Sequence, residues 1–238
     1  MVEQHLDAPP AVRLARVITS LRRSLLTVLA VFSLATVGFY SLSKPLLRWL
    51  QERLHQRLAF FSVAEPFLAH VKIAMAMATF CCMPLLVVVL WRALAKPFGL
   101  NRASVLWFSL FTCLLFYSGT AFCALVTLPY GIGFLLEFQG EQLQAVISIS
   151  HFVTFVAIFI LAFGVIFELP IFMVFTAKAG IIHRRTFERN RRYAVLLISI
   201  VAALLTPTPD VVNMMLMGIP LYLLYEAGIF VLKVIRIS

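Results

Sequence analysis

The stretch His151–Lys178, HFVTFVAIFILAFGVIFELPIFMVFTAK, decides the fold of this chain. It is long enough to cross a membrane, because about 20 apolar residues at about 1.5 Å each span a hydrocarbon core of about 30 Å. Between Phe152 and Ala177 the only charged residue is Glu168, and an ionised carboxylate at that depth costs roughly 3 kcal/mol. Pro170 follows and predicts a kink beside the acid. The segment therefore predicts a transmembrane helix with a polar functional site.

The composition is that of an integral membrane protein. Hydrophobic residues make up 62% of the 238 residues and charged residues 13%, whereas charged residues are about a quarter of a soluble domain. A formal net charge of +10 would suggest a nucleic-acid partner for a soluble protein. Here the basic residues cluster between apolar segments, where they orient the chain and contact lipid headgroups. The length predicts a single membrane domain, 1–238, without a second soluble domain.

The sequence contains no motif for catalysis or metal binding. The four cysteines lie in apolar segments without a C-x-x-C spacing, and the five histidines are scattered along the chain. The twenty-two phenylalanines suit lipid contact and core packing rather than the stacking of bases. We therefore expect no enzymatic activity, no cofactor, no metal and no nucleic-acid partner.

Six apolar segments are predicted to span the membrane. They are residues 24–42, 67–91, 104–128, 151–177, 193–205 and 211–232. The fifth offers about 13 residues, or roughly 20 Å of helix, and Pro220 interrupts the sixth, so both are expected to be short. Between the first two segments, residues 43–66 carry leucines at helical spacing and predict a helix at the membrane interface.

The distribution of lysine and arginine predicts the orientation. Fifteen of these residues fall before the first segment, in the second and fourth loops and at the C-terminus, and four fall in the first loop. The loop from Lys178 to Arg192 holds six of the fifteen. Since basic loops stay in the cytoplasm, both termini are predicted to be cytoplasmic.

The sequence resembles the TatC family, the polytopic subunit of the twin-arginine protein translocase, from about Leu21 to Phe230. The matching motifs are EPFLAHVK (Glu65–Lys72), GTAFCALVTLPYGIGFL (Gly119–Leu135), AFGVIFELP (Ala162–Pro170), LLTPTPD (Leu204–Asp210) and IPLYLLYE (Ile219–Glu226). The resemblance implies an all-α membrane protein with six transmembrane helices, both termini cytoplasmic, two short final helices and a concave, glove-like body.

The same resemblance implies a function. A TatC-like subunit exports folded proteins across the bacterial cytoplasmic (inner) membrane, with energy from the proton motive force. It docks twin-arginine signal peptides on the cytoplasmic side and recruits TatA-like and TatB-like single-span proteins, whose helices are expected beside the fifth and sixth spans. Self-association is expected, and no cofactor is required.

Two acids of the family pattern are missing from this chain. The family reads close to H-L-x-E-L-R-x-R before the first span, and here VITSLRRS places Ser20 at the glutamate position. The second loop of the family ends in a glutamate, and here Ala103 or Ser104 takes that position. Because a carboxylate pairs bidentately with arginine, the loss of both acids predicts weakened recognition of an Arg-Arg signal.

The candidate site residues fall in two groups. The signal-peptide region comprises Leu21, Arg22, Arg23, Pro97 and Arg102. The partner-binding or translocation-path residues are Glu65, Phe67, Lys72, Pro129, Phe163, Gly164, Glu168, Pro170, Pro207, Pro209, Asp210, Pro220, Tyr225 and Glu226. Structural roles stay open for several of them. Arg22 and Arg23 are candidate orientation anchors, Asp210 a helix cap, and Glu168 a neutral carboxylate bonded to a neighbouring helix.

Two further functions stay open at this point. One is a diverged paralogue with an assembly or specialised docking role and weakened twin-arginine recognition, which the two missing acids favour. The other is a proton-coupled carrier of small solutes that uses Glu168 as its protonatable site. The chain shows no internal repeat of the kind that marks many such carriers, and this weighs against the second.

Overall fold

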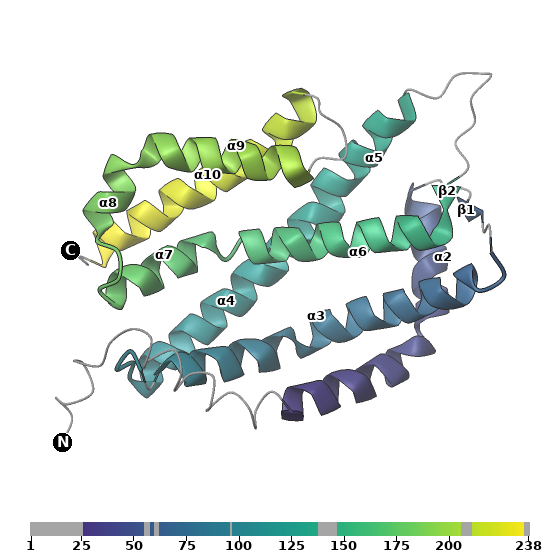
Figure 1. The fold of residues 1–238 in the computed structure, drawn as a ribbon, viewed down its shortest axis with the longest axis horizontal. Coiled ribbons are helices and arrows are strands. Elements are labelled where there is room, and N and C mark those ends of the chain that lie inside the picture. The colour runs from purple at the N-terminus through teal and green to yellow at the C-terminus, as the bar shows by residue number, and fades with distance from the viewer. Residues whose placement is uncertain are drawn as a thin grey trace. The chain divides into compact units, whose positions relative to one another are not determined.

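The computed structural model describes residues 26–54, 58–59, 62–95, 97–137, 147–205 and 211–235 (Figure 1). These residues are helical apart from turns and one short parallel ladder, in which β1 (Leu58–Ala59) pairs with β2 (Ile147–Ser148). The all-α prediction did not include this two-residue ladder. The chain divides into two compact units, the first within Met1–Arg53 and Phe60–Cys113 and the second within Leu54–Ala59 and Leu114–Ser238.

The first unit begins with a bent pair of helices. The helix Leu26–Tyr40 is followed by α2 (Ser43–Leu54), and the direction changes by 65° between Leu26–Tyr40 and Ser43–Trp49. The next helix, α3 (Glu65–Ala95), has 31 residues and runs through Pro84. The fourth, α4 (Arg102–Phe122), begins in this unit and ends in the second.

Aromatic contacts join α3 to α4 within the first unit. The indole Nε1–H of Trp91 donates a hydrogen bond of 3.0 Å to Thr112 Oγ1. The Trp91 ring also stacks on Phe108, with 4.6 Å between ring centroids. All three side chains are buried, and the indole N–H would be costly to leave unbonded there. These contacts set the spacing of the two helices near the turn that connects them.

The second unit contains the end of α4 and all later helices. They are the π-helical turn Cys123–Thr127, α5 (Leu128–Glu137), α6 (Ile149–Ile166), α7 (Leu169–Lys178), α8 (Arg184–Arg189), α9 (Arg191–Leu205) and α10 (Val211–Val234). The π turn lies just before Pro129, which cannot donate to the preceding helical turn, and a wider turn is one way to absorb that loss. Figure 1 shows α10 beside α7, α8 and α9, against which it packs.

Two glycines allow α4 and α6 to approach closely. A Cβ added to Gly164 would lie 2.5 Å from Phe116 Cε2, and one added to Gly119 would lie 2.6 Å from Phe167 Cγ. Phe116 and Phe163 are 1% and 0% exposed. Small residues permit such contacts between membrane helices because the backbones can then come together. Phe163 and Gly164, which were candidate partner residues, are thus part of the packing between α4 and α6.

Four helices among the described residues are long and apolar enough to cross a membrane, or five if the bent pair counts as one span. The four are Glu65–Ala95, Arg102–Gly133, Ile149–Lys178 and Met217–Val234. The helix α9 has 15 residues, about 22 Å, and is short as expected. Six spans, the cytoplasmic termini, the concave body and a single domain stay predictions.

The prediction that the last helix is also short is wrong. α10 has 24 residues, about 36 Å, and Pro220 lies inside it. Proline is tolerated within membrane helices because neighbouring groups and small local adjustments can satisfy the backbone carbonyl that it leaves without a donor. Pro220 therefore does not end the helix.

Candidate functional site

The long apolar segment is broken beside its acid. α6 ends at Ile166, Phe167 and Glu168 form a turn, and α7 begins at Leu169. Pro170 occupies the first turn of α7, where its missing N–H costs no helical hydrogen bond. The break is local, because Glu168 N–H donates to Val165 O at 3.1 Å and Phe172 N–H donates to Glu168 O at 3.0 Å. The predicted disruption at Pro170 is confirmed as a two-residue break.

The Glu168 carboxylate points into protein rather than out of it. Both carboxylate oxygens are buried, and the side chain makes no capping hydrogen bond to α7. Pro170 is buried as well, and its Cα lies 3.3 Å from the position that a Cβ on Gly228 of α10 would occupy. The packing of α7 against α10 therefore holds the acid in place. Burying a carboxylate is expensive, and a buried acid at a helix break is a candidate for function.

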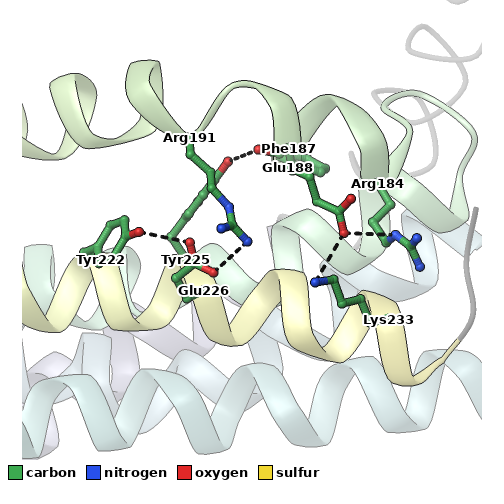
Figure 2. Close-up of polar contacts among 8 residues, drawn as sticks. All are labelled: Arg184, Phe187, Glu188, Arg191, Tyr222, Tyr225, Glu226 and Lys233. Carbon is green, nitrogen blue, oxygen red and sulfur yellow. Dashed lines mark hydrogen bonds and ion pairs between the residues drawn. The ribbon is translucent and has the colours of Figure 1, made fainter.

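A second cluster of polar side chains joins α8 and α9 to α10, and we call it the α10 clamp (Figure 2). Its members are Arg184, Phe187, Glu188, Arg191, Tyr222, Tyr225, Glu226 and Lys233. Glu226 forms an ion pair with Arg191, with 3.1 Å between Oε2 and Nη2. Its Oε1 accepts a hydrogen bond of 3.1 Å from the Tyr222 hydroxyl. The Tyr225 hydroxyl donates to Phe187 O at 2.7 Å. The Glu226 carboxylate thus contacts an arginine and a tyrosine of the same unit.

Glu188 forms the other half of the α10 clamp. Its Oε1 lies 3.3 Å from Arg184 Nε, one helical turn away on α8, and 3.7 Å from Lys233 Nζ on α10. All these ionic side chains are partly exposed, so each pair contributes little by itself and the network matters more than any member. The cluster fixes the basic stretch after α7 to the C-terminal part of α10.

Sequence reasoning identified part of the α10 clamp. Tyr225 and Glu226 were candidate partner residues, and the structure shows both in contacts within the second unit. Arg191 was counted as an orientation charge, and its pairing with Glu226 was missed. The spacing of Tyr222 and Glu226, four residues apart on one helix face, is a signal that would have indicated the contact between them.

We expect reversal of the charge at Arg191 to weaken the α10 clamp. Arg191→Glu replaces an attraction with a repulsion between two carboxylates, which costs about 1 to 2 kcal/mol for a partly exposed pair. For a chain of this size that corresponds to a fall of about 3 to 6 °C in the melting temperature of the detergent-solubilised protein.

The double variant and a matched control make this test specific. Arg191→Glu with Glu226→Arg restores the attraction and is expected to recover at least half of the lost stability. Arg185→Glu changes an exposed arginine of α8 and is expected to leave the melting temperature near that of the unchanged protein. A double variant no more stable than Arg191→Glu alone would show that the pair does not stabilise the fold.

The start of α3 holds the candidates Glu65, Phe67 and Lys72. Glu65 is the first residue of α3, and its N–H donates to Ser62 O at 3.1 Å. Phe67 is exposed, and its ring centroid lies 6.2 Å from that of Tyr40. Lys72 is half-buried on α3. Phe67 therefore sits beside the bend between the first two helices of this unit.

A hydrogen-bonded pair that sequence reasoning missed lies at the same bend. Ser43 is 0% exposed, and its hydroxyl donates to Tyr40 O at 2.7 Å. His70 Nδ1 lies 3.0 Å from the Ser43 hydroxyl oxygen. Because the hydroxyl has one proton, His70 donates through Nδ1–H. The pair ties α2 to α3, and neither residue belongs to a motif that would have revealed it.

The turn between α3 and α4 contains the candidates Pro97 and Arg102. Pro97 lies in the turn, Gly99 adopts a φ of 64°, and Asn101 Oδ1 accepts a hydrogen bond of 2.7 Å from Ser104 N–H. Asn101 thus caps α4, of which Arg102 is the first residue. Ala103 and Ser104, the positions at which the family carries a glutamate, supply no carboxylate.

The remaining candidates are placed as follows. Pro129 is half-buried near the start of α5, and Pro220 is half-buried inside α10. Leu21, Arg22, Arg23, Pro207, Pro209 and Asp210 lie outside the described residues. The structure therefore brings Glu168, Pro170, Tyr225 and Glu226 onto the packed pair α7 and α10, whereas Glu65, Phe67 and Lys72 belong to the first unit.

Comparison with known proteins points to one family. Residues 16–220 match the family described as Sec-independent protein translocase protein (TatC). The chain is 34% identical over 186 residues to the TatC protein of Carboxydothermus hydrogenoformans, covering 77% of this chain and 76% of the relative. It is 33% identical over 217 residues to that of Helicobacter pylori strain J99, covering 91% and 87%.

A solved structure gives the same result. A crystal structure of the twin-arginine translocase receptor TatC in DDM superposes with a TM-score of 0.77 at 28% sequence identity. The match covers 90% of this chain and 98% of that one. Fold and sequence therefore agree along almost the whole length.

Proposed function

Because this chain belongs to the TatC family of Sec-independent protein translocase proteins, we propose that it docks twin-arginine signal peptides and scaffolds TatA-like and TatB-like single-span partners. It is a multi-pass membrane subunit of a protein translocase and not an enzyme. In the proposal it lies in the bacterial cytoplasmic membrane with both termini in the cytoplasm. Folded cargo crosses beside it, driven by the proton motive force.

The observation that carries the proposal is the buried carboxylate of Glu168 in the α6–α7 break. Apolar membrane helices pack without such a group, and a buried acid that is kept despite its cost marks a candidate functional site. Pro170 and the contact of α7 with α10 hold it at one position. A carboxylate held at one position in an apolar membrane segment suits a contact with a partner helix or with passing cargo.

An apolar groove between α6 and α9 supports the scaffolding part. It has a volume of about 550 Å³ and is lined by residues of Ile158–Ile166 together with Val201 and Leu204. Ala162 is the small residue of the groove, and small residues at a helix surface favour close packing of another membrane helix. The short helix α9 exposes further apolar side chains, including Leu197 and Leu204.

Crosslinking of a signal peptide tests the docking part. A peptide with a photoreactive group beside its Arg-Arg pair is mixed with the full chain in membranes, and a Lys-Lys version serves as the matched control. We expect a crosslink that is weaker with the Lys-Lys version, since lysine does not reproduce the planar, five-donor guanidinium group of arginine. Equal crosslinking of the two peptides would contradict docking by the arginines.

One observation favours a second function, that of a paralogue with an assembly or specialised docking role. The helix ends on the two sides of the α3–α4 turn carry Arg92 and Arg102, and no acid occurs from residue 88 to residue 109. Such a surface repels an Arg-Arg signal. This function predicts no arginine-dependent crosslink, together with co-purification of a second TatC-like subunit that does bind the signal.

A further inference from the structure

A pocket of about 770 Å³ lies between the C-terminal part of α3 and the start of α4. We propose that it binds an anionic phospholipid, with the phosphate at Arg92 and Arg102 and an acyl ester carbonyl at Ser109. These three side chains are the polar part of the lining, and the rest is apolar, including Val88, Val105 and Leu106. The pocket belongs entirely to the first unit, and it shares Arg102 with the signal-peptide candidates.

The charges of the pocket select an anion. Arg92 and Arg102 come from two different helices and both line the same space. Since the sequence has no acid from residue 88 to residue 109, no carboxylate of this stretch neutralises them. Guanidinium groups bind phosphate through paired hydrogen bonds, and basic pockets between membrane helices hold anionic headgroups.

The buried hydroxyl of Ser109 points to a lipid rather than to free phosphate. Ser109 is 6% exposed and lines the pocket, and its Oγ has no hydrogen-bond partner among the described residues. A buried hydroxyl left in this state costs about 1 to 3 kcal/mol. It lies seven residues beyond Arg102 on α4, which is about 10 Å along the helix. A phospholipid offers both a phosphate and, below it, ester carbonyls that accept from a hydroxyl.

The pocket is preformed by the contacts beside it. Trp91, next to Arg92, is bonded to Thr112 and stacked on Phe108, which is next to Ser109. These buried contacts hold the two helices at a fixed spacing, so binding requires little reorganisation. Leu106 lines the pocket and is exposed, so an acyl chain can continue past it along the surface of α4.

Photolabelling with a lipid tests the proposal. The full chain is placed in phosphatidylcholine vesicles that contain a small share of phosphatidylglycerol with a diazirine in its acyl chain. We expect labelled peptides from residues 88–109, and about tenfold less labelling with phosphatidylcholine that carries the same diazirine. This comparison uses the unchanged protein, so the folding of a variant cannot obscure it. Equal labelling by the two lipids would overturn the proposal.

Variants then assign the contacts. Arg92→Gln with Arg102→Gln is expected to lower labelling by phosphatidylglycerol about tenfold, whereas Arg185→Gln with Arg189→Gln on α8 removes the same charge and leaves it unchanged. Ser109→Ala is expected to lower labelling about threefold. It is also expected to raise the melting temperature in lipid-free detergent, whereas the loss of a hydroxyl that stabilises the fold would lower it. Labelling that persists in the double arginine variant, or that inorganic phosphate abolishes, would contradict a lipid site.

Discussion

Replacing Glu168 with alanine is expected to abolish export of a twin-arginine reporter while the amount of the protein in the membrane stays the same. The carboxylate is buried at a break that Pro170 and the packing of α7 against α10 maintain without it. The main-chain hydrogen bonds of Glu168, to Val165 O and from Phe172 N–H, do not depend on its side chain. Removal of the side chain therefore takes away the polar group and leaves the break in place.

The size of the effect separates function from structure. We expect export to fall at least about tenfold in Glu168→Ala, with a change in unfolding free energy within about 1 kcal/mol. Exported reporter activity and immunoblots of the membrane fraction are measured on the same cells. Phe172→Leu on the exposed side of α7 is the control and is expected to change neither. If membrane abundance falls as far as export does, Glu168 has a structural role.

Replacing Gly164 with leucine is expected to prevent stable folding. A Cβ at this position would already lie 2.5 Å from Phe116 Cε2 and 2.9 Å from Thr120 Cγ2, and Phe116 is fully buried. The leucine side chain adds three more carbons at the same contact. Overpacking of this kind costs about 3 kcal/mol or more, since α4 and α6 must separate along their contact.

The measurement is the abundance and melting temperature of the membrane protein. We expect Gly164→Leu to lower abundance about tenfold and Gly164→Ala to have a smaller effect in the same direction. The matched control is Gly133→Leu on α5, where no described atom lies within 4 Å of an added Cβ. Normal abundance of Gly164→Leu would show that the close approach of the two helices is not required.

Some features of the fold follow directly from local sequence. A proline cannot donate the hydrogen bond that would continue α6, and this local property correctly predicted the break next to Glu168. The long apolar segments likewise predicted helices, because only helices satisfy the backbone inside lipid. The same argument failed at Pro220, where α10 continues, since a membrane helix can absorb one missing donor.

Contacts between distant residues were not predictable in this way. Arg191 and Glu226 are far apart in the sequence, and a loop arginine that pairs with a helix looks the same as one that only orients the chain. Gly119 stood inside a recognised motif, yet its contact with Phe167 depends on how α4 crosses α6. The Ser109 hydroxyl has no hydrogen-bond partner among the described residues, and this becomes apparent only when α3 and α4 are placed side by side.

Export in living cells tests the central claim most directly. The chain is expressed in bacteria that lack their own TatC subunit and retain the single-span partners, and export of a folded reporter with a twin-arginine signal is measured. As a control, a TatC protein of one of the relatives, chosen for a similar sequence identity to the host's own subunit, is expressed at the same level. It shows whether the host accepts a foreign subunit. We predict export with both. Export with the relative and none with this chain, at equal membrane abundance, would contradict its assignment as a self-sufficient signal-docking subunit.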